Sequence, residues 1–184
     1  MSNLELAQEA VRYVRAHVKY SSNKIGDRLA FAGGVEQVIR DRQGCDTQLW
    51  NTHQVIRRGM AFSEEYANRV ILNGIGNCGE MALIAYIWLR NHGARPVDYM
   101  QFGNRPPATN HAWVTVGRLT DSDLTNLRSW GPDAVWCDPW QGDGMAFSVL
   151  DLVQGKVRNL NWQFNLNRVD LIEQGWPTAI MRFE

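Results

Sequence analysis

This sequence has little cysteine, no excess of charge of either sign and no long apolar run. Its 184 residues include only three Cys. A small and odd number of cysteines argues against a disulfide framework and favours a reducing compartment. Nineteen Lys and Arg balance nineteen Asp and Glu, so no overall field marks the chain for nucleic acid or an anionic membrane. No apolar run reaches the roughly 20 residues of a membrane span, and no basic-then-apolar leader opens the chain. We therefore expect a soluble cytoplasmic protein with no membrane span and no nucleic-acid partner; export into a target cell would proceed without a classical signal peptide.

Motifs for common cofactors and metals are also missing. There is no glycine-rich phosphate loop with a Lys and no dinucleotide fingerprint. His17 and His53 lie on expected helices without Cys, His or carboxylate partners at metal spacing, and Cys45 has no partner pattern. Residues 142–144, Gly-Asp-Gly, are more typical of a turn than of a cation site. We expect no metal and no cofactor.

What is present is the composition of one globular domain over residues 1–184, with 45% apolar and 21% charged residues. The first 73 residues are expected to form a helical part. In the first helix, from Leu4 to Arg15, the apolar side chains of Ala7, Val11 and Val14 recur near one face with Leu4. Further helices are expected over residues 29–42, 47–58 and 63–73, after a polar break at 21–27.

The best-defined helix runs from Cys78 to Arg90. Asn77 is suited to cap its N-terminus, and Glu80 three residues later resembles a capping box. Gly93 marks the end of the helix. The middle of the helix is apolar nearly all round, which predicts a buried central helix.

Beyond this helix the pattern changes to short alternating runs that are typical of an antiparallel sheet. Strands are expected over residues 97–102, 111–118, 135–138 and 178–183. Residues 103–110 are expected to form a loop, and 120–130 a short helix or irregular insertion. Helices followed by strands predict the α+β class, with helices packed on an antiparallel sheet.

Cys78 stands at about the first position of the buried helix. There the free backbone N–H groups and the positive end of the helix dipole favour a thiolate. Gly76 and Gly79 are expected to leave room for a substrate. The simpler alternative is a small buried apolar residue, which is the commoner role of a free cysteine.

His111 opens an expected strand on which it shares one face with Trp113 and Thr115. Its position at the beginning of the strand would let the imidazole reach a helix N-terminus. The alternative is a structural histidine whose ring is satisfied by its neighbours.

Asp138 ends the next expected strand, on the same face as Trp136. Cys137 should then point to the opposite side and pack there. The alternative for Asp138 is a turn or cap residue before Pro139. Asp143 is a second candidate carboxylate, but it lies off the strand.

Taken together, these three residues supply a nucleophile, a base and an orienting carboxylate. The order Cys, His, Asp on helix, strand and strand resembles the papain-like and transglutaminase-like superfamily of cysteine enzymes. The resemblance spans residues 74–140, the triad-bearing core, with residues 141–184 expected to add C-terminal strands. Its motifs are residues 76–82 with 89–95, 110–114, and 136–140.

The resemblance implies attack of the Cys78 thiolate on an amide carbonyl, with a thioester intermediate that water or an amine resolves. It also implies an oxyanion hole, to which the backbone N–H of Cys78 would contribute. The second donor would come from upstream, and the spacing does not choose among Gln48, Trp50 and Gln54. The residues expected to flank the site are Asn77, Gly79, Trp113, Trp136 and Trp140. The three tryptophans are expected to form its walls.

Small members of this superfamily without accessory domains resemble bacterial protein-glutamine deamidase effectors, which modify proteins of a target cell. The expected function is therefore deamidation of a glutamine side chain on a protein substrate. The alternatives are a transglutaminase or a cysteine endopeptidase with the same triad, or an inactive domain that binds a partner.

Overall fold

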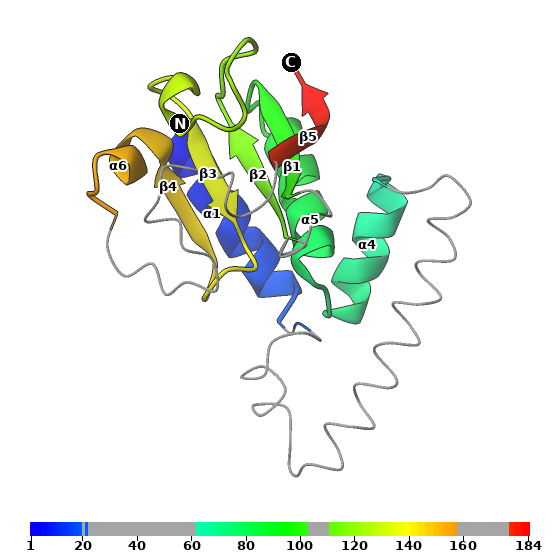
Figure 1. The fold of residues 1–184 in the computed structure, drawn as a ribbon. Helices are drawn as coiled ribbons and strands as arrows, with labels where there is room; N and C mark the ends of the chain where they lie inside the picture. The colour runs from blue at the N-terminus through cyan, green and yellow to red at the C-terminus, as the bar shows by residue number, and fades with distance from the viewer. Residues whose placement is uncertain (20, 22–61, 103–110, 158–176) are drawn as a thin grey trace.

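In the computed structural model of this chain, five antiparallel strands of the described residues form one sheet, and helices pack against it (Figure 1). The structure describes residues 1–19, 21, 62–102, 111–157 and 177–184. The α+β class is therefore confirmed. The helices are α1 (Asn3–His17), α4 (Glu64–Asn73), α5 (Cys78–Asn91) and α6 (Val149–Val153), with a 3-10 turn η2 (Leu127–Ser129). The strands are β1 (Val97–Phe102), β2 (Ala112–Val116), β3 (Val135–Asp138), β4 (Met145–Ser148) and β5 (Pro177–Phe183), in the spatial order β4-β3-β2-β1-β5.

Helix α1 begins with a capping box, in which Ser2 and Glu5 satisfy each other's backbone N–H groups. Of the face that the periodicity predicts, Ala7, Val11 and Val14 are buried and Leu4 is half-buried. The helix packs on α5, β3 and β4. The buried residues of α1 are Leu6, Ala7, Ala10, Val11 and Val14.

Helix α5 is the central helix that the sequence predicts. Its residues from Glu80 to Ile87, and Leu89, are buried, because the helix lies between α1 and α4 and also packs on β1 and β2. At its N-terminus the backbone N–H of Asn77 donates to Oε2 of Glu80 at 2.9 Å, within a capping box. The preceding helix α4 ends at Asn73 and is capped by Gly74, whose φ of 68° lies in the left-handed region that glycine adopts without strain.

Strand register assigns side chains to the two faces of the sheet. On β2, Val114 pairs with Tyr99 of β1 and with Cys137 of β3, so these three side chains share the face on which the helices pack. The Cys137 sulfur lies 3.6 Å from the carbonyl oxygen of Ala7 in α1. The alternation along β2 and β3 therefore places Trp113 and Trp136 on the opposite face.

Three details differ from the sequence-based predictions. Strand β2 is shorter than residues 111–118, so His111 precedes the strand instead of opening it. The segment 141–184 contains helix α6 as well as strands β4 and β5, because Ser148 caps a helical turn directly after β4. Strand β4 escaped detection because only Phe147 of its four residues is buried, which leaves a weak alternation.

Other predictions fall on residues that the structure does not describe. They are the helices over 29–42 and 47–58 and the loop over 103–110, together with Gln48, Trp50, Gln54, Cys45 and His53. Among the helices that the structure describes, none is long and apolar enough to cross a membrane.

Candidate functional site

A buried imidazole–carboxylate pair lies where β2 begins and β3 ends. Nε2 of His111 is 2.6 Å from Oδ2 of Asp138. Both residues are 2% exposed, so the pair is shielded from bulk water. Antiparallel pairing of the two strands brings the residues together, because the residue before β2 and the last residue of β3 meet at one end of the sheet.

The second oxygen of Asp138 is held by the turn that follows β3. Its Oδ1 accepts hydrogen bonds from the backbone N–H groups of Trp140, at 3.1 Å, and Gln141, at 3.0 Å. Pro139, which directly follows Asp138, has no N–H of its own. The carboxylate therefore has a fixed orientation, with Oδ1 toward these two backbone N–H groups and Oδ2 toward His111.

Cys78 is the first residue of α5 and is partly exposed. Its thiol lies close enough to His111 to contribute to the raised pKa of that histidine. Nε2 of His111 faces Asp138, so a proton exchanged with Cys78 would be held on Nδ1. The three predicted residues thus lie in the order of a thiol, an imidazole and a carboxylate.

The surroundings of His111 act on its pKa in opposite directions. Burial lowers the pKa, because a low dielectric disfavours the charged ring. The charge and hydrogen bond of Asp138, with smaller contributions of the same kind from Cys78, outweigh burial and raise the pKa of His111 to about 10. The site therefore favours a protonated imidazole between two groups that can carry negative charge.

Cys137 is the contrasting thiol. It is fully buried against α1, and burial together with the nearby Asp138 charge raises its pKa, which keeps the thiol neutral. This matches the expectation that Cys137 packs on the side away from Asp138. Of the two cysteines in the described residues, Cys78 alone has a histidine partner.

Tryptophans pack around His111. The Trp140 ring centroid is 5.2 Å from that of His111, and Trp113 stacks on His111 at 6.1 Å. Behind them Trp113 stacks on Trp136 at 4.4 Å, and Trp136 stacks on Trp130 at 6.3 Å. Of the tryptophans expected at the site, Trp113 and Trp140 lie beside His111, whereas Trp136 packs behind Trp113. Trp130, which the sequence did not mark, stacks on Trp136 and lies outside the site.

The two glycines near Cys78 differ from each other. A Cβ on Gly76 would lie 3.0 Å from Cβ of Glu80 and 3.1 Å from a methyl of Val70, so the side chains of the protein itself fill the space beside Gly76. The expectation that Gly76 leaves room for a substrate is wrong. Gly79 is more open, since a Cβ placed there would have the Tyr99 hydroxyl, at 3.5 Å, as its nearest neighbour.

Sequence reasoning missed several residues around the site. The hydroxyl of Tyr99 donates to the carbonyl oxygen of Gly79 at 3.2 Å, and the hydroxyl of Tyr66 donates to Oε1 of Glu80 at 3.0 Å. Ser21 is 2% exposed and bonds to both Trp140 and Asn77. Only Tyr99 had a signal in the sequence, since it alternates within a predicted strand.

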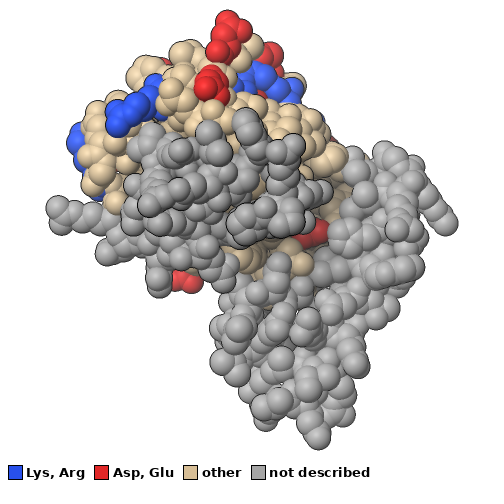
Figure 2. All heavy atoms as spheres, in the orientation of Figure 1, with Lys and Arg blue, Asp and Glu red and all other residues tan. Residues whose placement is uncertain are grey.

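The remaining candidates have other positions. His17 is exposed at the end of α1, with Nδ1 2.8 Å from the Tyr13 carbonyl oxygen, and Asp143 is exposed in a turn. Within the described residues no group of three or more His, Cys, Asp and Glu side chains could hold a metal ion. Where Figure 2 shows described residues, acidic and basic side chains are interspersed, in keeping with the zero net charge.

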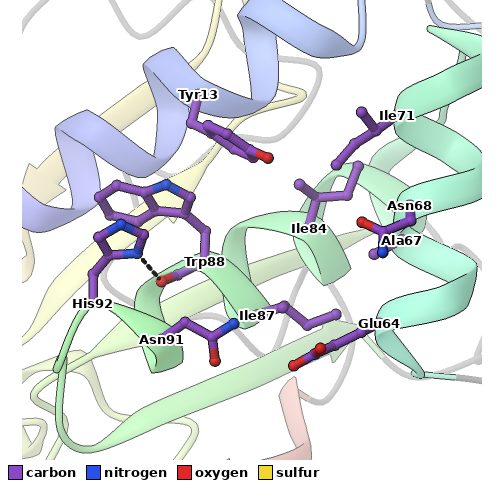
Figure 3. Close-up of a pocket in the computed structure, with 10 residues that line it drawn as sticks. All are labelled: Tyr13, Glu64, Ala67, Asn68, Ile71, Ile84, Ile87, Trp88, Asn91 and His92. Carbon is purple, nitrogen blue, oxygen red and sulfur yellow. Dashed lines mark hydrogen bonds between the residues drawn. The ribbon is translucent and has the colours of Figure 1, made fainter.

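A separate pocket of about 320 Å³ lies between α1, α4 and α5 (Figure 3). Tyr13, Trp88 and His92 contribute aromatic rings, and the Trp88 and His92 rings stack at 3.7 Å. Because Trp88 and His92 lie at the C-terminal end of α5, the pocket is remote from Cys78 at the N-terminal end. Its other lining residues are Glu64, Ala67, Asn68, Ile71, Ile84, Ile87 and Asn91.

Comparison of the chain with protein-family models, with curated proteins and with solved structures finds no match.

Proposed function

We propose that this protein is a cysteine-dependent enzyme of the papain-like, transglutaminase-like kind, with Cys78, His111 and Asp138 as its catalytic residues. The observation that carries the proposal is the buried contact of 2.6 Å between His111 and Asp138, beside a partly exposed thiol at a helix N-terminus. A structural histidine needs a hydrogen-bond partner, but it does not need a thiol on its other side.

The proposed reaction begins with the Cys78 thiolate and the His111 imidazolium. The sulfur attacks the carbonyl carbon of a side-chain amide, and the C–N bond breaks as the imidazolium gives its proton to the departing nitrogen. Ammonia leaves and a thioester remains. Neutral His111 then takes a proton from water, whose oxygen attacks the thioester, and the thiol returns as a carboxylic acid is released.

Asp138 would keep the imidazole in the useful orientation and stabilise its protonated form. Backbone N–H groups at the start of α5 would stabilise the oxyanion, with the N–H of Cys78 as one donor. Gln48, Trp50 and Gln54 stay candidates for the second donor.

The proposed substrate is a glutamine side chain on another protein, and the proposed outcome is deamidation. Water suffices to resolve the thioester, whereas a transglutaminase also needs a docking site for an amine donor. The choice of deamidation and of a target-cell protein rests on the resemblance of the sequence motifs.

The first test needs no substrate. Iodoacetamide should label Cys78 of the folded protein faster than Cys45 or Cys137, with peptide mass spectrometry reporting each site. Faster labelling of Cys78 supports an activated thiol. Labelling of Cys78 that is no faster than that of the other two cysteines supports a domain that only binds a partner.

The second test separates the reaction types. A glutamine-containing protein such as casein is incubated with the enzyme and a tagged primary amine, and ammonia, amine incorporation and fragments are measured together. Ammonia with the small mass gain of amide-to-acid conversion supports deamidation, whereas tagged product indicates a transglutaminase and fragments indicate a peptidase. Cys78→Ala should abolish the activity and Cys137→Ala should retain it. Activity that persists in Cys78→Ala would overturn the mechanism.

A further inference from the structure

Trp140 joins the carboxylate of the site to a segment distant in the sequence. Its backbone N–H donates to Oδ1 of Asp138, while its indole Nε1–H donates to Oγ of Ser21 at 2.8 Å. The indole ring also packs against His111, and the residue is 6% exposed. One residue thus lies against both members of the imidazole–carboxylate pair.

Ser21 continues this connection to the start of helix α5. Its hydroxyl accepts from Trp140 and donates to Oδ1 of Asn77 at 3.0 Å. A hydroxyl can do both at once, because it has one proton to give and lone pairs to receive. Asn77 caps α5 and directly precedes Cys78.

The resulting chain of hydrogen bonds runs from Asp138 through Trp140 and Ser21 to Asn77. It therefore begins at the group that orients His111 and ends at the residue beside the nucleophile. Trp140, Ser21 and Asn77 come from three separate segments, and each bond of the chain is buried or partly buried. Buried hydrogen bonds of this kind hold groups in one geometry, because breaking one leaves a desolvated donor or acceptor.

We propose that Trp140 and Ser21 are positioning residues that fix the His111–Asp138 pair relative to the N-terminus of α5. This inference rests on the proposed function, since it assigns these two residues to the same site. Proton transfer between Cys78 and His111 depends on the separation and angle of the two groups, which the hydrogen-bonded chain sets. Neither residue contacts the reacting atoms in this role.

The test uses Trp140→Phe and Ser21→Ala: both remove the hydrogen bond between Trp140 and Ser21, and Ser21→Ala also removes the one from Ser21 to Asn77. Phenylalanine keeps an aromatic ring beside His111 and loses the indole N–H. For each folded variant, the rate of Cys78 labelling by iodoacetamide is measured from pH 5 to pH 11, a range that includes the pKa of about 10 at His111. We expect labelling near pH 6 to be slowed by about 3- to 30-fold, with the midpoint of the profile moved upward. The double variant should be no slower than Ser21→Ala alone, because Ser21→Ala already removes the hydrogen bond that Trp140→Phe removes.

Trp130→Phe is the matched control. Trp130 is also fully buried, and its indole N–H also makes one hydrogen bond, to the Asp123 carbonyl oxygen at 3.0 Å. Its loss should lower stability without moving the pH midpoint. Ser21→Thr, which keeps a hydroxyl, should restore most of the labelling rate that Ser21→Ala loses.

The outcomes separate the two proposals. If Cys78 of the unmodified protein labels rapidly while both folded variants keep its rate and midpoint, the positioning role is overturned and the proposed function stands. If Cys78 of the unmodified protein labels no faster than Cys45 and Cys137, the proposed function fails, and the positioning role fails with it.

Discussion

Two buried aspartates lie on one face of the same sheet, at opposite ends, and their partners differ in kind. Asp138 ends β3 and faces His111. Asp98, near the start of β1, is fully buried and faces two arginines: Nε of Arg118 at 2.9 Å, and one terminal nitrogen of Arg182 at 3.1 Å from both of its oxygens.

This difference in partners makes the charge of Asp98 structural and that of Asp138 reactive. A guanidinium keeps its proton throughout the ordinary pH range, so the charge on Asp98 is compensated permanently. An imidazole gains and loses its proton, so the interaction at Asp138 changes with pH and with the state of Cys78. Both aspartates are buried, so burial alone does not distinguish a structural carboxylate from a reactive one. The partner that each carboxylate faces does.

The largest effect expected is that of Asp138→Asn on reactivity. Asparagine retains an oxygen that can accept the backbone N–H groups of Trp140 and Gln141, but it removes the charge that stabilises protonated His111. Turnover should fall by roughly 10²- to 10⁴-fold, as it does when the carboxylate of other catalytic triads is neutralised. The initial rate on a glutamine substrate measures this, and a folded variant with unchanged turnover would remove Asp138 from the mechanism.

Asp98→Asn should reverse the pattern, with a large loss of stability and little change in reactivity. The substitution leaves the Arg118 side chain, which is 5% exposed, without its compensating charge. The free energy of unfolding should fall by about 3 kcal/mol, as measured with urea. Asp121→Asn, at an exposed carboxylate, is the control and should change it by less than about 0.5 kcal/mol. If Asp98→Asn slowed Cys78 labelling as strongly as Asp138→Asn, the two aspartates would not be functionally separate.

The two aspartates should also differ in how stability depends on pH. The pKa of His111 is raised from an ordinary 6.5 to about 10, so folding favours the protonated ring. The stabilisation is then fully present below about pH 6.5 and is lost as the pH rises toward 10. The stability gap between the unmodified protein and Asp138→Asn should narrow by about 1–3 kcal/mol over this interval, whereas the gap for Asp98→Asn should stay constant. Parallel urea titrations at pH 6.5 and pH 9.5 test this, and a constant gap for Asp138→Asn would contradict the raised pKa.

The reactive end of the sheet could be predicted from the sequence to a large extent. Helix periodicity and the capping pattern placed Cys78 at the start of a buried helix, and strand alternation put Asp138 and Cys137 on opposite sides. Each of these inferences uses neighbours within one element, where spacing along the chain fixes spacing in space.

The contacts of Asp98 with Arg118 and Arg182, and the hydrogen bonds of Ser21, could not be predicted in the same way. Arg182 reaches Asp98 because β5 pairs with β1, and that pairing includes a register shift between Tyr99 and Met100. Strand order and bulges depend on the whole fold, so no local pattern encodes them. Ser21 is a similar case, since it follows α1 as an ordinary polar residue and acquires its partners only when distant segments pack around it.

The smallest effect should come from Arg182→Lys, which tests how compensation of Asp98 is shared. Lysine keeps the charge but loses the planar fork that bonds to both Asp98 oxygens, the Arg118 carbonyl and the Thr120 hydroxyl. Because Arg182 is more exposed than Arg118, at 17% against 5% of the side chain, the loss should be only about 1 kcal/mol, without an effect on Cys78 labelling. Arg128→Lys, on an exposed side chain, provides the baseline. If Arg182→Lys lowered the free energy of unfolding as much as Asp98→Asn does, Arg182 would be the main compensating charge. The dominant ion pair would then join β1 to β5, and the pair between Asp98 and Arg118, which follows β2, would be secondary.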